Sequence, residues 1–193
     1  MLKFIVGLGN PGSQYEKTRH NAGFVFLDML ASANSSAWAN AAQFQGEVAN
    51  CSIGGDKFVL LKPMTFMNKS GMSVGKLLRY YKFKPEEMLV VHDELELAEG
   101  AARLKRDGGH AGHNGLRDII ANIDSRDFYR LRMGIGRPAT GSNIADYVLS
   151  KPSRLGEDLL EKLCKALLEK MDLIVAGDVA RFNEFAGQVN LQK

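Results

Sequence analysis

Two residues of this sequence, His20 and Asp93, could together activate water. His20 lies in the segment Thr18-Arg19-His20-Asn21-Ala22-Gly23, and an imidazole with an ordinary pKa of about 6.5 can take a proton from water near neutral pH. Asp93 directly follows the apolar run 88–92, and a carboxylate that binds one imidazole nitrogen fixes the tautomer of the ring. Local sequence leaves plainer roles open, since His20 could be structural and Asp93 could cap a helix or a turn.

A glycine-rich turn follows the first apolar segment and presents Asn10. The letters GLGNPG match the G-x-G-x-x-G pattern of dinucleotide sites, but Pro11 interrupts the turn and no acidic residue ends a second strand about 20 residues later. We therefore favour a tight turn at the carboxyl end of a central strand over a nucleotide site. Ligands of open α/β sheets bind at such strand ends, so Asn10 is expected to face a cleft.

Two further segments add polar groups. In PMTFMNKSG, Asn68 could cap the next helix or bind a peptide group, with Phe66 and Met67 as an apolar wall. In GGHAGHNG, the glycines allow the backbone to approach a ligand at the start of a helix. His110 and His113 in that loop could bind a metal with acidic residues elsewhere, although the spacing fixes no third ligand.

The sequence favours direct attack by water over a covalent intermediate. A G-x-S-x-G turn is absent, and neither a serine nor a cysteine stands out as a nucleophile. Cys51 and Cys164 lie far apart and outside metal-ligand spacing, so neither a disulfide nor a zinc site is indicated. This cysteine usage fits a reducing cytoplasm.

The charge distribution indicates a polyanionic partner. The net charge is only +3, but seven basic residues and no acidic one occur between Lys57 and Lys84. A second basic stretch runs through Arg103, Lys105, Arg130 and Arg132. For a single lysine a solvated surface is the simpler interpretation, whereas two stretches of this size favour a polyanionic partner.

The chain of 193 residues with 45% hydrophobic residues is long enough for one compact domain, 1–193. No apolar run approaches the ~20 residues that cross a membrane. Strand and helix patterns alternate, which predicts an α/β fold with a mixed, twisted sheet surrounded by helices. We expect a mobile, lid-like region at about 138–153, centred on the Gly141 loop, and C-terminal helices over 154–188. The other expected strands are 2–8, 44–53, 57–61, 88–92, 103–106 and 129–135, and the expected helices are 21–33, 68–81, 115–123, 155–175 and 179–186.

Five motifs together resemble one family. GLGNPG, YEKTRHNAG, PMTFMNKSG, HDELEL and GGHAGHNGL occur in the order and spacing of bacterial peptidyl-tRNA hydrolases, over residues 3 to about 150. The resemblance implies a single-domain, cofactor-independent enzyme without a metal. Such an enzyme cleaves the ester between a peptide and the 3′ ribose of tRNA, and so recycles tRNA from prematurely released chains.

The resemblance also implies roles for residues. His20 is the general base for water, Asp93 orients it, and Asn10 polarises the substrate. Lys105 and Arg132 correspond to a basic pair that grips the phosphate at the tRNA 5′ end, and Arg130 is a neighbour that could share this role. Tyr15, Met67, Asn68, His113 and Asn114 correspond to residues that line the substrate cleft.

Departures from the family pattern are few. Ala98 stands where many relatives have proline, which affects loop stiffness, and Asp107 replaces a frequent glycine close to Lys105, which would weaken the phosphate grip. The expected partner is peptidyl-tRNA, bound through its acceptor stem and peptide, by a cytoplasmic monomer that needs neither a membrane nor an obligate protein partner. Two alternatives stay open, a non-catalytic RNA-binding protein on the same scaffold and a metal-dependent hydrolase that uses His110 and His113.

Overall fold

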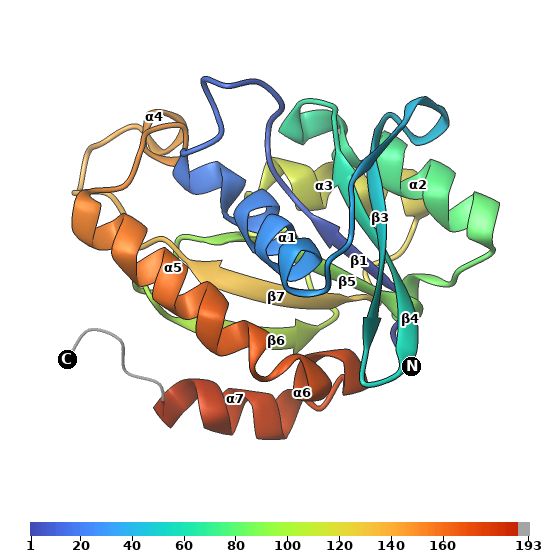
Figure 1. Ribbon diagram of the computed structural model, residues 1–193. Coiled ribbons are helices and arrows are strands. Elements are labelled where there is room, and N and C mark those ends of the chain that lie inside the picture. The colour runs from blue at the N-terminus through green and yellow to red at the C-terminus, as the bar shows by residue number, and fades with distance from the viewer. Residues whose placement is uncertain (189–193) are drawn as a thin grey trace.

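The computed structural model describes residues 1–188 of the chain, which form a seven-stranded mixed sheet covered by helices on both faces (Figure 1). The strand order is β2-β3-β4-β1-β5-β7-β6. The strands are β1 (Phe4–Gly7), β2 (Ala39–Ala41), β3 (Gly46–Ile53), β4 (Asp56–Pro63), β5 (Met88–Glu94), β6 (Ala102–Arg106) and β7 (Tyr129–Gly134).

The centre of the sheet is parallel and buried on both faces. β1 pairs in parallel with β4 and β5, and β5 pairs in parallel with β7. Every residue of β1 and β5 is buried, which explains why β1 and the first four residues of β5 are apolar. Gly7 is in register with Val91, so the residues that follow β1 and those that end β5 meet at one edge of the sheet.

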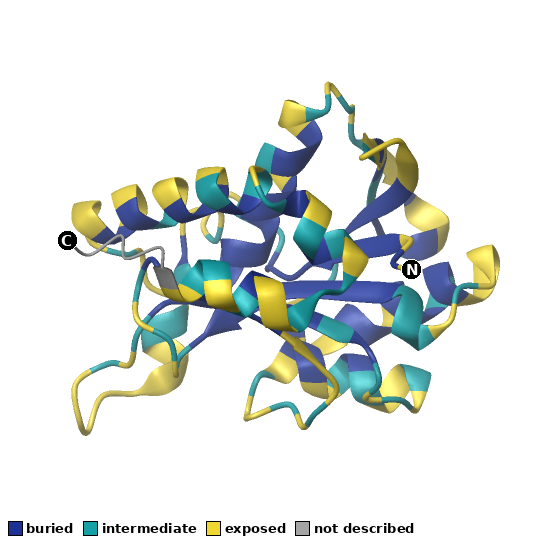
Figure 2. Cartoon of the chain, turned by 90° about the horizontal axis from the view of Figure 1, so that it is seen from below, coloured by how far each residue is buried: buried dark blue, intermediate teal, exposed yellow. Residues whose placement is uncertain are grey.

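Two groups of helices cover the faces. The long helices are α1 (Ala22–Ala33), α2 (Ser70–Tyr81), α3 (Asn114–Ile123), α5 (Arg154–Leu168) and α7 (Val179–Gln188), and the short ones are α4 (Ile144–Val148) and α6 (Met171–Ala176). α1, α5, α6 and α7 pack with Leu2 and Ile5 on one face, whereas α2 and α3 pack with Phe4 and Val6 on the other. The sheet is therefore a buried layer between helices whose outer faces are exposed (Figure 2).

Short 3-10 turns precede or join several elements. They are η1 (Arg19–Asn21), η2 (Ala42–Phe44), η3 (Met67–Lys69) and η4 (Pro85–Glu87). No helix within residues 1–188 is long and apolar enough to cross a membrane.

The predicted α/β class and mixed sheet are confirmed, and the expected strands 44–53 and 57–61 form the antiparallel pair β3 and β4. One predicted helix, 155–175, was wrong as a single element, because α5 ends at Leu168 and α6 starts at Met171. After the break, Met171 and Ile174 of α6 are buried in the core. The sequence also predicted neither β2, which is only three residues long, nor α4, which lies within the expected lid.

Candidate active site

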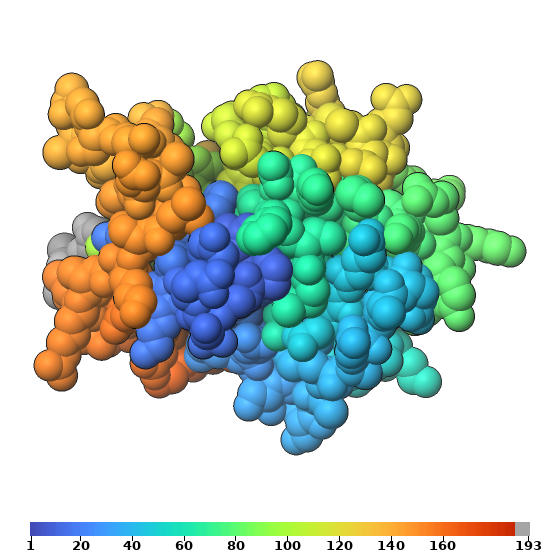
Figure 3. Space-filling model, turned by 90° about the horizontal axis from the view of Figure 1, so that it is seen from above, coloured from blue at the N-terminus to red at the C-terminus, as the bar shows by residue number. Residues whose placement is uncertain are grey.

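A cavity of about 570 Å³ opens at the edge of the sheet where β1 and β5 end. Segments far apart in the sequence meet around it: the loop after β1, the turn before α2, the loop before α3, and α4 (Figure 3). The cavity brings together eight of the predicted site residues, namely Asn10, Tyr15, His20, Met67, Asn68, Asp93, His113 and Asn114. Lys105 and Arg132 are not among its lining residues.

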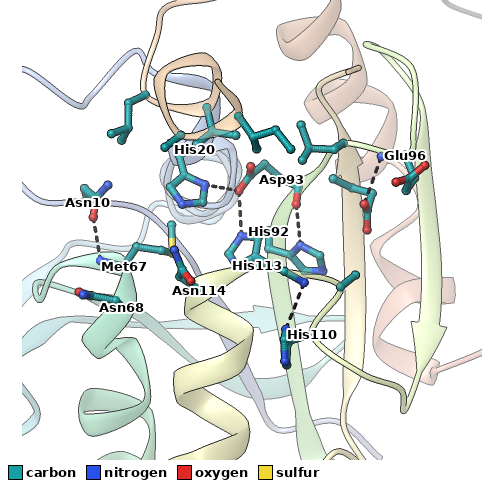
Figure 4. A pocket seen from close by; sticks show the side chains of 18 of the residues that line it. Asn10, His20, Met67, Asn68, His92, Asp93, Glu96, His110, His113 and Asn114 are labelled. Atoms are coloured by element: carbon teal, nitrogen blue, oxygen red, sulfur yellow. Dashed lines mark hydrogen bonds and ion pairs between the residues drawn. The ribbon is translucent and has the colours of Figure 1, made fainter. Parts of the chain in front are cut away.

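His20 and Asp93 form a buried pair. His20 lies on the 3-10 turn η1, and its Nδ1 lies 2.9 Å from Oδ1 of Asp93, whose side chain is 2% exposed (Figure 4). Burial alone would raise the pKa of the Asp93 carboxyl, but His20 and His113 beside it hold that pKa well below its ordinary value. An ionised carboxylate only accepts hydrogen bonds, so Nδ1 of His20 carries the proton and Nε2 carries the lone pair.

His113 binds the same carboxylate oxygen. Its Nε2 lies 2.9 Å from Oδ1 of Asp93, and its ring centroid lies 5.0 Å from that of His20. Its other nitrogen, Nδ1, accepts hydrogen bonds from the backbone N–H groups of Gly115 and Leu116 at the start of α3. The sequence placed His113 in the cleft but gave no sign of this double contact.

Asn10 is held by a reciprocal pair of hydrogen bonds that the sequence interpretation missed. The Asn10 backbone N–H donates to Oδ1 of Asn21, and Nδ2 of Asn21 donates to the Asn10 carbonyl, both at 2.9 Å. Oδ1 of Asn10 in turn accepts from the Met67 backbone N–H at 2.7 Å. The Asn10 side chain is therefore oriented with its oxygen toward Met67 and its amino group as the donor left for a ligand (Figure 4). Asn21, in the segment RHNAG, was the available signal.

The remaining amides lie at the rim. Asn68 and Asn114 are exposed and line the cavity, and Oδ1 of Asn114 accepts from Arg117 at 3.1 Å. The position that precedes α2 as its N-cap is Lys69, so the capping role left open for Asn68 does not occur. Tyr15 forms an apolar wall with Phe66, their ring centroids 6.4 Å apart.

Buried His92 lies behind these groups. Its Nδ1 is 2.7 Å from the Asp93 carbonyl, its ring packs edge-on against His113, and its Nε2 has no hydrogen-bond partner within residues 1–188. Burial first, and then the neighbouring His113, lower the pKa of His92 to about 3. The imidazole is therefore neutral at physiological pH.

A metal fits this cluster poorly. The group with metal-ligand spacing is His20, Asp93 and His113, whose ligand atoms lie within 4.8 Å of one another, and His110 does not belong to it. A neutral imidazole that binds a metal through Nε2 carries its proton on Nδ1. In His113 that proton would point at two backbone N–H donors. The arrangement therefore matches a hydrogen-bonded carboxylate rather than a metal site.

Comparison with known proteins identifies the family. The family model described as "Peptidyl-tRNA hydrolase" matches residues 4–192. The chain is 52% identical to the peptidyl-tRNA hydrolase of Dichelobacter nodosus, over 92% of this chain and 95% of the relative, and 48% identical to that of Methylococcus capsulatus, over 93% and 95%. The chain belongs to the peptidyl-tRNA hydrolase family.

Solved structures agree with this assignment. The crystal structure of peptidyl-tRNA hydrolase from Acinetobacter baumannii superimposes with a TM-score of 0.89 at 42% identity, and the match covers 98% of this chain and 95% of that one. The prediction of this family, of its fold and of an enzyme with peptidyl-tRNA hydrolase activity is thereby confirmed.

The basic residues predicted to bind a tRNA phosphate lie on β6 and β7, at one edge of the sheet. In the β6–β7 register Lys105 is opposite Arg130 and Arg103 is opposite Arg132, so all four share one face. Lys105 is exposed, whereas Arg132 donates through Nε to Glu94 at 2.8 Å. Asp107 faces Arg130, where its charge opposes the lowering of the Arg130 pKa by burial.

Arg130 differs from its neighbours on that face. It is 3% exposed, and its two terminal nitrogens donate to the carbonyl oxygens of Gly108 and Gly109. The two terminal nitrogens of Arg130 therefore hold the glycine loop, and a phosphate contact shared by Arg130 stays a prediction.

The expected lid region contains α4, and the apolar side chains of Ile144, Val148 and the adjacent Leu149 line the cavity. Arg19, next to His20, ties this segment down by donating to Oγ of Ser150 at 2.7 Å and to the carbonyl of Lys151 at 2.8 Å. The mobility expected for 138–153 stays a prediction. The helix itself has a sequence signal that was missed, since Asn143 caps it through the Ala145 N–H.

Proposed function

We propose that the chain hydrolyses the ester between a peptide and the 3′ ribose of tRNA, with His20 as the general base. The observation that carries the proposal is the hydrogen bond of 2.9 Å between Nδ1 of His20 and buried Asp93. It fixes the tautomer in which Nε2 can accept a proton from water.

The reaction then proceeds as follows. Nε2 of His20 takes a proton from a water molecule as its oxygen attacks the ester carbonyl, and Asp93 stabilises the imidazolium that forms. The amino group of Asn10, oriented by the contact of its oxygen with Met67, donates to the carbonyl oxygen as negative charge develops there. When the ester bond breaks, His20 returns the proton to the ribose 3′ oxygen. Peptide acid and free tRNA result.

The walls of the cavity suit a peptide next to the reacting ester. Tyr15, Phe66 and Met67 form an apolar side, and the exposed amides of Asn68 and Asn114 can bind peptide groups at the rim. We propose these residues, with His113, as the substrate-facing wall. A volume of about 570 Å³ is typical of a ligand site.

We further propose that Lys105 and Arg132 bind phosphate at the tRNA 5′ end. Lys105 on β6 is exposed and lies on the same face of the sheet as Arg132 on β7. The ion pair of Arg132 with Glu94 reduces the net charge there, so Lys105 is expected to contribute more of the phosphate affinity. The proposed enzyme works on translation products in the cytoplasm, as a monomer without an obligate protein partner.

The test is release of tRNA from a purified peptidyl-tRNA. His20→Ala is expected to lower kcat by roughly 10²- to 10⁴-fold, the usual contribution of a general base. His110→Ala, which removes a histidine outside the carboxylate cluster, should keep most of the activity.

Three outcomes would count against the proposal. Full activity of the His20→Ala protein would exclude His20 as the base. Loss of wild-type activity on addition of a chelator, restored by a metal, would favour the metal-dependent hydrolase. An inactive but tRNA-binding wild type would favour the non-catalytic RNA-binding protein.

A further inference from the structure

We infer that His113 is a positioning residue that holds the Asp93 carboxylate in place for His20, in addition to lining the cleft. The inference rests on the proposed function, because it concerns how the base is oriented. His113 joins two elements, since it stands before α3 and binds a side chain of β5.

The tautomer of His113 is set by its contacts with the start of α3. Nδ1 lies 3.1 Å from the Gly115 nitrogen and 3.3 Å from the Leu116 nitrogen, and both of these donate N–H groups. Nδ1 must therefore hold the lone pair, which leaves the proton on Nε2. That proton points at Oδ1 of Asp93, 2.9 Å away.

The ring of His113 cannot easily reorient. Turning it over would remove the acceptor from the first turn of α3, whose backbone N–H groups otherwise lack partners. The helix therefore fixes His113, and His113 fixes the carboxylate. Figure 4 shows the rings of His20 and His113 meeting at the same carboxylate oxygen of Asp93.

Without the His113 donor, Asp93 would keep only its hydrogen bond with His20 of the two that hold its Oδ1. Asp93 as a whole residue is only 3% exposed, so water cannot readily replace a lost hydrogen bond to its carboxylate. With only His20 bound, the carboxylate can rotate and His20 can populate its other tautomer. In that tautomer Nε2 carries the proton and cannot act as a base.

The contacts of both ring nitrogens of His113 distinguish this positioning role from substrate binding. Both ring nitrogens of His113 are used within the protein, so neither can also form a hydrogen bond to a substrate in this arrangement. His113 can offer a ligand only its ring surface. Its loss should therefore reduce turnover more than substrate affinity.

The test compares His113→Asn with His110→Asn, the same substitution three residues earlier in the loop. Asparagine is a preferred N-cap, so it retains the acceptor for α3, but it is too short to reach Asp93. For His113→Asn we expect kcat to fall by about 10- to 100-fold with KM changed less than about threefold and an unchanged Tm. His110→Asn should leave kcat near its wild-type value, because His110 lines the cavity but does not belong to the cluster around Asp93.

Nitrogen-15 NMR of the histidine rings provides an independent readout. In the wild type, His20 should carry its proton on Nδ1 and His113 on Nε2, and His113→Asn should convert His20 to a mixture of tautomers. Because the wild-type spectrum alone tests the His113 tautomer, the inference stays testable even if the variant does not fold.

Three results would overturn the inference. They are an unchanged kcat for His113→Asn, a rise in KM alone, and a wild-type His113 protonated on Nδ1. None of them affects the proposed function, which depends on His20→Ala. Conversely, full activity of His20→Ala would overturn the proposed function whatever His113 does.

Discussion

At the scale of single residues, the site works through the choice of hydrogen-bond partner. Oδ1 of Asp93 accepts from two histidines, and Oδ1 of Asn10 accepts from the Met67 backbone. Each contact uses one end of a side chain and so determines which end faces the cavity. The same logic separates Arg130, whose donors hold a loop, from exposed Lys105.

Lys105→Ala tests the proposed phosphate contact at this scale. Substrate affinity should weaken, and the slope of log affinity against log salt should become shallower by about 1, because one phosphate contact is lost. Arg106→Ala is the matched control, since Arg106 lies on the opposite face of β6 and pairs with Asp127 at 2.6 Å. Binding titrations at several salt concentrations measure the slope, and an unchanged slope for Lys105→Ala would refute the contact.

At the scale of elements, the close approach of α1 to the sheet places His20 opposite Asp93. Gly23 makes this approach possible, because a Cβ atom there would lie 2.4 Å from both the Leu8 nitrogen and the Val91 oxygen. Those two atoms form the hydrogen bond that joins the end of β1 to β5. A larger residue would push the first turn of α1, and η1 before it, away from the strand ends.

Gly23→Ala is therefore expected to lower the free energy of unfolding by about 1–3 kcal/mol, the usual effect of overpacking. It should also reduce kcat, since His20 lies three residues earlier. Gly187→Ala is the control, because nothing lies within 4 Å of a Cβ atom there and alanine favours the helix. Urea denaturation measures both variants, and equal midpoints would contradict the expectation.

At the scale of the whole molecule, the buried layer of the sheet contains ionisable groups that make stability depend on pH. His92 is 1% exposed, and its pKa in the folded state is about 3. Between this value and about 6.5 the unfolded chain binds a proton that the folded chain does not. The groups that face His92 are Asp93, His113 and Arg130.

The sign follows from that difference. Because the folded pKa of His92 is depressed, its neutral form stabilises the fold above pH 6.5, and this stability is lost as the pH falls toward 3. From pH 7 to pH 5 the contribution to the free energy of unfolding should fall by about 2 kcal/mol. The lowered pKa values of Asp93 and Glu87 affect stability mainly below pH 5, because their ordinary values are 3.8 and 4.5.

Urea denaturation at pH 7 and pH 5 checks this expectation with His92→Gln as the comparison, because glutamine does not titrate. The variant should lose less stability than the wild type between the two values. An equal loss in both proteins would mean that another group causes the pH dependence.

The sequence by itself determined the α/β alternation, the strand ends that carry Asn10 and Asp93, and, through five ordered motifs, the family. These are local properties, because apolar period and turn residues act within a few positions of one another. The same local signals were too weak for β2 and misleading for 155–175, where packing of Met171 and Ile174 bends the chain.

Only the tertiary structure decided how the polar groups pair. His20 and Asp93 are 73 positions apart in the sequence. No local pattern predicts that His113 binds the same carboxylate oxygen or that Asn21 binds the backbone of Asn10. Nor does one predict that the side chain of Arg130 is buried against the glycine loop. Those contacts depend on the order of strands in the sheet and on how closely α1 approaches it. Short-range hydrogen bonds form only after long-range packing has brought their partners within about 3 Å.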